Sequence, residues 1–247
     1  MRKIALFLVL ATITTQTPAA EFRASYGDWR YDLSGTVTDR GRTYDLREDF
    51  GAEPRGRRTW ALEWDTPKGP WPDVAVGFTQ IGAAGAQERS FTVFDLLGQP
   101  VGTETASLAA TADFDDVEAT LRYPFKLGTA RAALGVSVKK IKGELVIEDS
   151  TASPPTSRQS YDETVPEVHA QLRVPFGKIL ALSTSAQGIS AGGNRALEWK
   201  AMLEVRWLAP LLLEAGWQEK RYELNLDGRA LDARFDGALL RAGWLWR

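Results

Sequence analysis

The single histidine of the chain, His169, is the first residue to consider for catalysis. If Gly177-Lys178 forms a three-residue turn, His169 lies opposite Ser185 on paired antiparallel strands, with Glu167 two residues away. These are the residue types of a nucleophilic triad. Glu167 and His169, however, are same-strand neighbours about 6–7 Å apart, and Ser185 lies in no nucleophile elbow. We therefore expect a histidine hydrogen-bonded within a polar network, and no catalytic residue.

Four acids are the second candidate site: Asp113, Asp115, Asp116 and Asp149. They are expected near the rim of the fold derived below, where paired acids would serve an aspartyl-type protease and oxygen ligands would suit Ca²⁺. No histidine accompanies them, and the fixed ligand spacing of a calcium loop is missing. A solvated rim is the favoured interpretation, and the sequence predicts no metal site and no cofactor.

Two groups of charges suggest surface contacts rather than chemistry. Lys139, Lys140 and Lys142 are expected near the outer end of a strand, where they would meet lipopolysaccharide phosphates or remain a hydrated rim. Residues 38–58 form a mixed-charge stretch that would bind a partner or simply be solvated. The absence of cysteine excludes disulfides, thiol catalysis and cysteine-based zinc sites.

The overall composition excludes several classes of protein. The 247 residues carry 30 Lys and Arg against 32 Asp and Glu, so there is no large field of one sign to attract nucleic acid. With 44% hydrophobic and 25% charged residues, the chain is neither disordered nor a helical membrane protein of several spans.

The elements that must position these residues are strands, because apolar and polar residues alternate strictly along the chain. Between residues 196 and 207, for example, Leu197, Trp199 and Leu203 share one parity while Glu198 and Glu204 share the other. Clear segments of this kind are 117–123, 131–139, 167–174, 196–207, 211–218 and 240–246, and weaker ones run near 22–36, 58–65, 72–82 and 179–189. The parity of the first segment changes around Gly27-Asp28, which predicts a β-bulge there.

The connections between these ten segments alternate in length. Short turns are expected at 66–71, 126–128, 177–178 and 209–210, and generally longer polar loops at 38–56, 83–111, 149–160, 191–194 and 226–230. An even strand count with short turns at one end and long loops at the other predicts an all-β fold, an antiparallel up-and-down transmembrane barrel of about ten strands. One misread hairpin, for instance within 83–111, would give eight or twelve strands.

Tryptophan placement favours this barrel over a soluble sandwich. Trp199 and Trp207 are expected on one face, roughly 20 Å apart in height, close to the ~25 Å apolar band of outer-membrane barrels. The residues expected to form aromatic girdles at the membrane interfaces are Trp64, Trp71, Trp199, Trp207, Trp217, Trp244 and Trp246.

The polar parity must then face the interior of the barrel. The expected network of interior charges is Glu118, Arg122, Arg131, Glu167, His169, Arg173, Glu198, Lys200, Glu204, Arg206, Glu214 and Arg241, with Glu63, Asp73, Lys139 and Lys220 on the same parity. Opposite charges in so narrow a barrel favour ion pairs over conduction, since open porins need about 16 strands. A largely closed interior is therefore the first hypothesis, and a narrow small-solute pore is the alternative.

Residues 1–20 have the features of a secretory signal peptide, leaving residues 21–247 as the mature barrel domain. Arg2 and Lys3 precede an apolar run that is too short to span a membrane, and cleavage is expected after Ala19 or Ala20.

Several motifs resemble a family of roughly 250-residue outer-membrane barrel proteins of Gram-negative bacteria that have no assigned activity. They are Trp71-Pro72, the Glu-Ala-Gly-Trp of residues 214–217, and the closing residues 235–246. The resemblance covers essentially the whole mature chain and implies an outer-membrane location. The last strand also resembles the signal read by the barrel-assembly machinery, with Leu240, Trp244 and Trp246 at alternating positions, although Arg247 follows the final aromatic residue.

These observations together predict an integral barrel with a structural, lipid-contacting or partner-contacting role. A narrow channel is the second hypothesis, and an outer-membrane hydrolase is a remote third.

Overall fold

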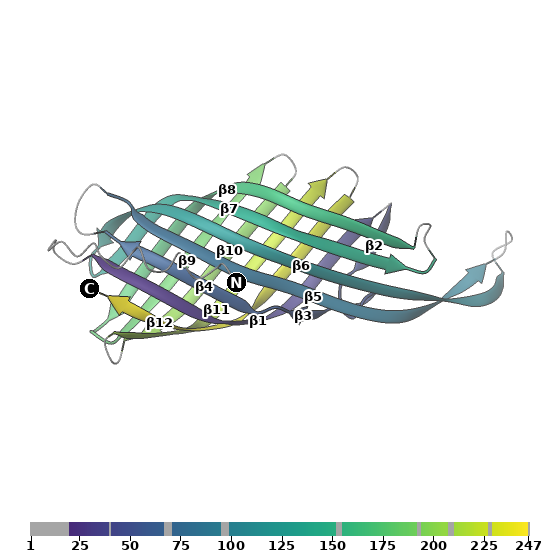
Figure 1. Cartoon of the computed structure of the whole chain (residues 1–247), viewed down its shortest axis with the longest axis horizontal. Coiled ribbons are helices and arrows are strands. Elements are labelled where there is room, and N and C mark those ends of the chain that lie inside the picture. Colours follow the sequence, from purple (N-terminus) through teal and green to yellow (C-terminus); the bar gives the residue numbers. More distant parts are fainter. Residues whose placement is uncertain are drawn as a thin grey trace, which may run out of the picture.

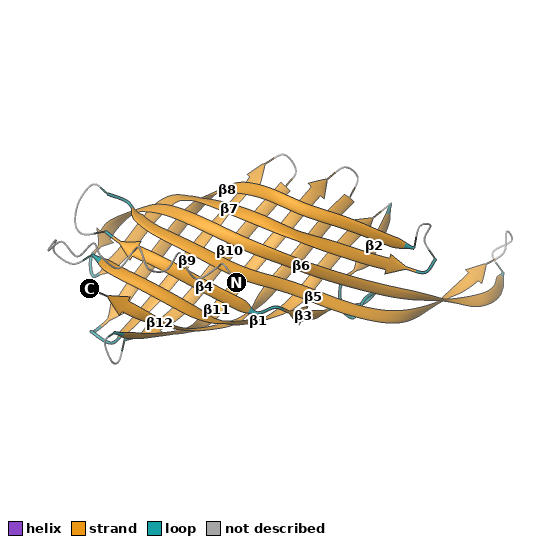
Figure 2. Cartoon of the chain, viewed as in Figure 1, coloured by secondary structure: helices purple, strands orange, loops and turns teal. Residues whose placement is uncertain are grey.

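The computed structural model of the chain describes residues 20–39, 41–66, 71–94, 99–151, 155–191, 194–206, 210–226 and 229–246. The expected signal peptide therefore lies, except for Ala20, outside the described residues. Strands make up nearly all of this part of the chain and form an elongated barrel (Figures 1 and 2). No helix among the described residues is long and apolar enough to cross a membrane.

Ten strands form the wall of the barrel. They are β1 (Glu21–Asp39), β4 (Arg58–Asp65), β5 (Asp73–Phe94), β6 (Pro100–Leu127), β7 (Ala130–Asp149), β8 (Thr156–Phe176), β9 (Leu180–Ala191), β10 (Asn194–Val205), β11 (Leu211–Leu226) and β12 (Arg229–Trp246). Each pairs antiparallel with the next, and β12 pairs with β1, which closes the sheet. Two short strands, β2 (Arg42–Asp45) and β3 (Glu53–Arg55), are additional. The prediction of a closed antiparallel barrel with ten strands in its wall is confirmed.

The segment 83–111, expected to be a long loop, is instead mostly strand. β5 and β6 stay paired from Asp73 and Arg122 up to Phe94 and Pro100, and this hairpin projects beyond the rest of the barrel (Figure 1). Residues 82–86 read Gly-Ala-Ala-Gly-Ala, so the two faces of the strand hardly differ in polarity and periodicity does not mark it. The expected loop 38–56 likewise contains β2 and β3.

The bulge expected at Gly27-Asp28 is absent. The pairing of β1 with β12 runs without a register shift from Phe22 opposite Trp246 to Thr38 opposite Ala230. What changes along β1 is the polarity of its two faces. Near the start of the strand the inward residues are polar, and further along they are apolar.

The part of the barrel nearest the short turns has an apolar exterior. On β7, the outward residues Leu134, Val136 and Val138 are all at least half exposed. Other strands of the wall also carry outward apolar residues that are more than a third exposed, including Tyr123, Phe125, Val168, Leu172, Leu182, Leu203, Leu213 and Leu240. Such an exterior around a charged interior is the pattern of a barrel that spans a lipid bilayer. We call this part the membrane tier.

The part of the barrel furthest from the short turns has a polar exterior and an apolar interior, and we call it the outer tier. Beyond Val138, the outward residues of β7 become Lys140 and Lys142, while Ile141, Leu145 and Ile147 point inward and are buried. Inward aromatic residues from three other strands join them: Trp29, Tyr31, Tyr222 and Phe235. A polar exterior over an apolar core is the pattern of a protein surrounded by water, so this tier extends outside the membrane.

Residues 42–52, which we call the lid, begin with β2, which pairs with β1 in the outer tier, and lead into β3, which pairs with β5. Leu46 and Phe50 of the lid are buried in the core. Arg42 and Tyr44 reach across the barrel and donate hydrogen bonds of 2.9 and 2.8 Å to the Asp149 carboxylate at the end of β7. The lid is therefore held both by apolar burial and by a charged contact.

This contact makes the stability of the outer tier depend on pH. Burial raises the pKa of Asp149, but hydrogen bonds from Thr151, Tyr44 and Arg42 outweigh this effect and bring the pKa below its ordinary value. A carboxylate with a depressed pKa stabilises the fold above its ordinary pKa, and this contribution is lost as the pH falls through the lowered value.

We predict that Asp149→Asn lowers the free energy of unfolding by roughly 1–2 kcal/mol at pH 7. The difference from the wild type should shrink as the pH falls below about 4. Urea unfolding of the barrel in lipid vesicles at several pH values measures this, with the exposed Asp115→Asn as the matched control. A difference that stays constant down to pH 2.5 would contradict the assignment.

Candidate functional site

Ion pairs fill the interior of the membrane tier, and the first cluster joins β1, β4 and β6. Arg23 contacts Glu63 at 3.1 Å and Asp65 at 2.9 Å, and Arg122 contacts the same two acids at 2.7 and 3.2 Å. Arg131 reaches Asp73 at 2.5 Å. Each arginine comes from a different strand, so the cluster ties the barrel wall together across its interior.

A second cluster lies at the same end of the barrel and joins β1 to β8 and β10. Arg206 contacts Glu21 at 2.7 Å, and Arg173 contacts both Glu21 and Glu204. Arg23 lies 3.8 Å from Glu204 and so links this cluster to the first. Arg241 pairs with Glu214 at 2.9 Å between β12 and β11. Glu21 pairs with Arg206 across 185 residues of chain.

The third cluster lies higher in the membrane tier and is centred on Glu198. Its carboxylate contacts Lys200 at 2.7 Å, Lys139 at 2.8 Å and Lys220 at 3.3 Å. Lys220 also contacts Asp116 at 2.5 Å. All of these side chains except Lys200 are almost completely buried. Buried charges of this kind must be paired, since an isolated ion away from water is very costly.

His169 belongs to this polar interior rather than to a catalytic triad. Its Nδ1 donates a hydrogen bond of 2.9 Å to Gln187, whose Nε2 donates one of 2.5 Å to Glu118. Ser185 pairs instead with Gln171, so the expected pairing with His169 is wrong by two residues. The cause is the turn, which spans residues 177–179 and so lies one position later than assumed.

Glu167 is also buried, but its contact is with Lys139 at 3.4 Å, not with His169. Neither of its carboxylate oxygens has a hydrogen-bond partner among the described residues. The three residues of the expected triad are therefore not brought together.

The four acids expected at the rim do not lie together in the structure. Asp113 and Asp115 are exposed on the outer surface, whereas Asp116 points inward and is only 2% exposed. Asp149 lies further along, opposite Leu108, and holds the lid. The expectation that these acids form one solvated rim is wrong for Asp116 and Asp149. Within the described residues, no group of three or more His, Asp or Glu side chains is arranged to hold a metal ion.

Lys139, Lys140 and Lys142, expected together at the outer end of a strand, do not share one side of the wall. Lys139 points inward to Glu198 and is 1% exposed, so it cannot reach a lipid phosphate. Lys140 and Lys142 point outward at the boundary between the two tiers, and Lys140 pairs with Asp162 at 2.6 Å.

The expected girdle tryptophans that are described all face outward. Trp64, Trp71, Trp199, Trp217, Trp244 and Trp246 are each more than a third exposed. Trp246 packs beside Phe22 with ring centroids 5.2 Å apart, near the turn end of the barrel. Trp199 Nε1 donates a hydrogen bond to Glu219 at the upper edge of the apolar band. Trp207 lies outside the described residues.

Several residues of the interior were not among those predicted from the sequence. Glu21 and Arg23 lie on a weakly alternating strand from which no interior residue was predicted, whereas Asp65 shares the parity of Glu63, which was predicted to face inward. Asp116 was missed because it follows two outward acids. The interior left between the clusters is a polar cavity of about 80 Å³ bordered by Arg23, Lys200 and Arg241 among others.

The interior of the barrel has two parts of opposite polarity. The ion-pair clusters fill the membrane tier, and the apolar core with its lid fills the outer tier. The arrangement explains how the wall is held together.

No protein-family model matches the sequence, and no curated protein is significantly similar to it. Among solved structures, the chain is similar to the outer membrane protease OmpT from Escherichia coli, with a TM-score of 0.56 and 9% identity over 96% of this chain and 100% of that one. It is more distantly similar to an outer membrane channel from Pseudomonas putida F1, with a TM-score of 0.44 and 8% identity over 96% and 98% of the two chains. For Ail of Yersinia pestis the TM-score is 0.34 and the identity 13%, over 92% and 99%.

At these identities the comparison shows the fold alone. The chain has the fold of the outer-membrane β-barrels, a result that agrees with the apolar exterior and the charge-paired interior described above.

We predict that Glu198→Gln destabilises the barrel strongly. Removing one partner leaves three lysines facing an uncharged amide in a buried site, which costs roughly 3–5 kcal/mol. Urea unfolding in lipid vesicles tests this. Glu223→Gln, which affects the partly exposed pairs with Arg221 and Arg195, should change stability by about 0.5 kcal/mol or less. Equal effects of the two substitutions would show that the Glu198 cluster does not support the fold.

Proposed function

We propose that the protein is a closed integral barrel of the outer membrane with a structural, lipid-contacting role. What supports this proposal is the content of its interior, which holds buried ion pairs in the membrane tier and an apolar core with the lid in the outer tier. A lumen filled in this way is suited to holding a rigid wall in the bilayer rather than to passing solutes.

Export and assembly form part of the same proposal. Residues 1–20 act as a cleaved signal peptide, on the strength of their basic start, short apolar run and small residues before the barrel. The assembly machinery reads the last strand, where Leu240, Trp244 and Trp246 alternate on the outward face of β12. Membrane lipid surrounds the exposed apolar band.

We propose that the protein has no enzymatic activity. His169 hydrogen-bonds to Gln187, and the acids Asp113, Asp115, Asp116 and Asp149 lie apart. This arrangement supports a structural role for the interior polar groups.

The anionic headgroups of the outer leaflet are proposed as a specific contact. Lys140 and Lys142 face outward where the apolar exterior ends, the height at which lipopolysaccharide phosphates would lie. We predict that the double substitution Lys140→Ala and Lys142→Ala weakens lipopolysaccharide binding by roughly tenfold. Binding of the folded barrel to lipopolysaccharide measures this.

The matched control replaces Lys126 and Lys178 by alanine, since both are exposed at the short-turn end of the barrel. An equal loss of binding in both double variants would remove the proposed specificity of Lys140 and Lys142.

Conductance tests the central proposal against the alternative of a narrow pore, which the polar cavity among Arg23, Lys200 and Arg241 would favour. We expect the mature protein, verified as a folded and heat-modifiable barrel, to give no discrete current steps in a planar bilayer. Salt-dependent steps that change size on Lys200→Ala would establish a channel and overturn the proposal.

A further inference from the structure

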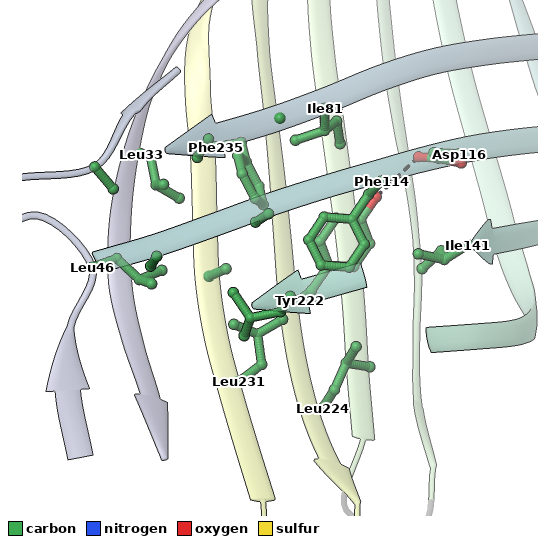
Figure 3. Close-up of a pocket in the computed structure, with 17 residues that line it drawn as sticks. Leu33, Leu46, Ile81, Phe114, Asp116, Ile141, Tyr222, Leu224, Leu231 and Phe235 are labelled. Carbon is green, nitrogen blue, oxygen red and sulfur yellow. Dashed lines mark hydrogen bonds between the residues drawn. The ribbon is translucent and has the colours of Figure 1, made fainter. Parts of the chain in front are cut away.

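In the described part of the chain, the interior of the outer tier leaves little room for a ligand. The apolar cavity drawn in Figure 3, lined by Leu33, Ile81 and Phe235 among others, measures about 30 Å³. A space of this size holds at most about two water molecules. A larger binding partner must therefore contact the exterior of this tier, where the charged residues lie.

The outward face of β1 becomes charged closer to the short turns than that of its neighbour β12. Asp28 and Arg30 stand opposite Leu240 and Ala238 of β12, which are apolar and exposed. Counted from the short-turn end, the first outward charge of β12 comes only at Asp236. Asp28 and Arg30 are 51% and 73% exposed and pair with each other at 3.3 Å. Because charges that face lipid are costly, the layer of polar headgroups must reach further toward the short turns on this side of the barrel.

Three further arginines lie beside this charged pair. Arg58 of β4 stands opposite Asp28, and the carbonyl oxygen of Arg57 accepts a hydrogen bond of 2.8 Å from the backbone N–H of Trp29. Arg55, the last residue of β3, is two positions earlier in the chain. All three arginines are exposed, and none forms an ion pair with an acidic side chain among the described residues.

Exposed arginines elsewhere on the outer tier are already paired with acids. Arg221 of β11 contacts Glu223 at 3.0 Å, and Arg234 of β12 contacts Glu219 at 3.1 Å. A guanidinium group without such a partner keeps its donors available, and its planar fork suits the oxygens of a phosphate group. The three arginines beside β1 are therefore suited to bind an anion from outside the chain.

Aromatic residues lie on the membrane side of these arginines. Trp60 follows Arg58 on the same face of β4, two residues closer to the short turns, and its ring stacks on Phe78 with centroids 5.9 Å apart. Tyr26 of β1 stands opposite Trp60 and is 57% exposed. Aromatic rings at a membrane interface pack against lipid below the headgroup level. The site thus has charge above and apolar surface below, which matches a lipid with an anionic headgroup.

We propose that Arg57 and Arg58, with Arg55 beside them, bind the phosphate of a phosphorylated glycolipid of the outer leaflet, whose acyl chains lie over Trp60 and Phe78. The unpaired guanidinium groups supply the positive charge, and the early onset of charge on β1 brings the headgroup down to them. This inference rests on the proposed lipid-contacting role and adds a second site to the lysines of β7.

Native mass spectrometry of the folded protein released from detergent micelles counts the bound lipid and gives its Kd. The starting variant carries Lys140→Ala and Lys142→Ala, so that lipid bound through those lysines does not contribute. The probes are lipid A with two phosphates, dephosphorylated lipid A, and glucosamine 1-phosphate, which has a phosphate but no acyl chains. We expect one molecule of the first probe per barrel, and a Kd at least about tenfold higher for each of the other two.

Two further double substitutions in this starting variant locate the site. Arg57→Gln with Arg58→Gln should raise the Kd for lipid A by at least about tenfold, because two positive charges near the headgroup are lost. Arg221→Gln with Arg234→Gln removes the same charge from exposed but paired positions and should change the Kd by less than about twofold. None of the four arginines belongs to the interior ion pairs, and heat-modifiable migration verifies that each variant folds.

Several outcomes would overturn the proposal. Equal losses in the two double substitutions would show unspecific attraction, and an unchanged Kd on substitution of Arg57 and Arg58 would place the lipid elsewhere. Tight binding of dephosphorylated lipid A would remove the role of the phosphate, and tight binding of glucosamine 1-phosphate would assign the site to a soluble ligand. If lipid A binds only when Lys140 and Lys142 are present, the lysine contact stands and the arginine site is wrong. If the wild type does not bind lipid A either, both contacts are wrong.

Discussion

The rest of this structure depends on one constraint: a lipid bilayer accepts neither unpaired backbone groups nor unpaired charges. Closure of β12 onto β1 satisfies the backbone by removing the sheet edges. The charged residues of the membrane-crossing strands must then face inward and find partners there. Glu198 illustrates the result, because three lysines from different strands converge on its carboxylate.

The same strands leave the membrane with the opposite arrangement. On β7 the change occurs between neighbouring residues, since Lys139 faces inward to Glu198 and Lys140 is the first charged residue that faces outward. Above this point water surrounds the wall, so stability comes from burying apolar side chains rather than from pairing charges. One continuous sheet thus holds two interiors of opposite polarity, and Asp116 lies where they meet.

Alternation was sufficient to predict much of the membrane tier from the sequence. Segments such as 196–205 have large apolar residues on one parity and charges on the other, and only a barrel in lipid satisfies both. The outer tier was not predicted from the alternation. That prediction assumes that the inward residues stay polar and the outward residues stay apolar along the whole strand. On β1 the apolar residues pass from the outward to the inward parity, and this was interpreted as a bulge at Gly27.

The partners within the interior could not be predicted from the sequence. Arg206 and Glu21 are 185 residues apart, and their contact depends on the tilt and stagger of every intervening strand. The partner of His169 likewise depends on the pairing register of its strand. Placing the turn at residues 177–179, one position later than assumed, moves its partner from Ser185 to Gln187.

Spin-label accessibility along β7 tests the account of two tiers most directly. The chain contains no cysteine, so single cysteines at successive positions from 134 to 147 each carry one label without further changes. Even-numbered positions should be accessible to oxygen up to Val138 and to a water-soluble nickel complex from Lys140 onward, and odd-numbered positions to neither. Nickel access at Ser137 or Lys139 would reveal an open lumen, and oxygen access well beyond Lys140 would contradict the change from membrane tier to outer tier.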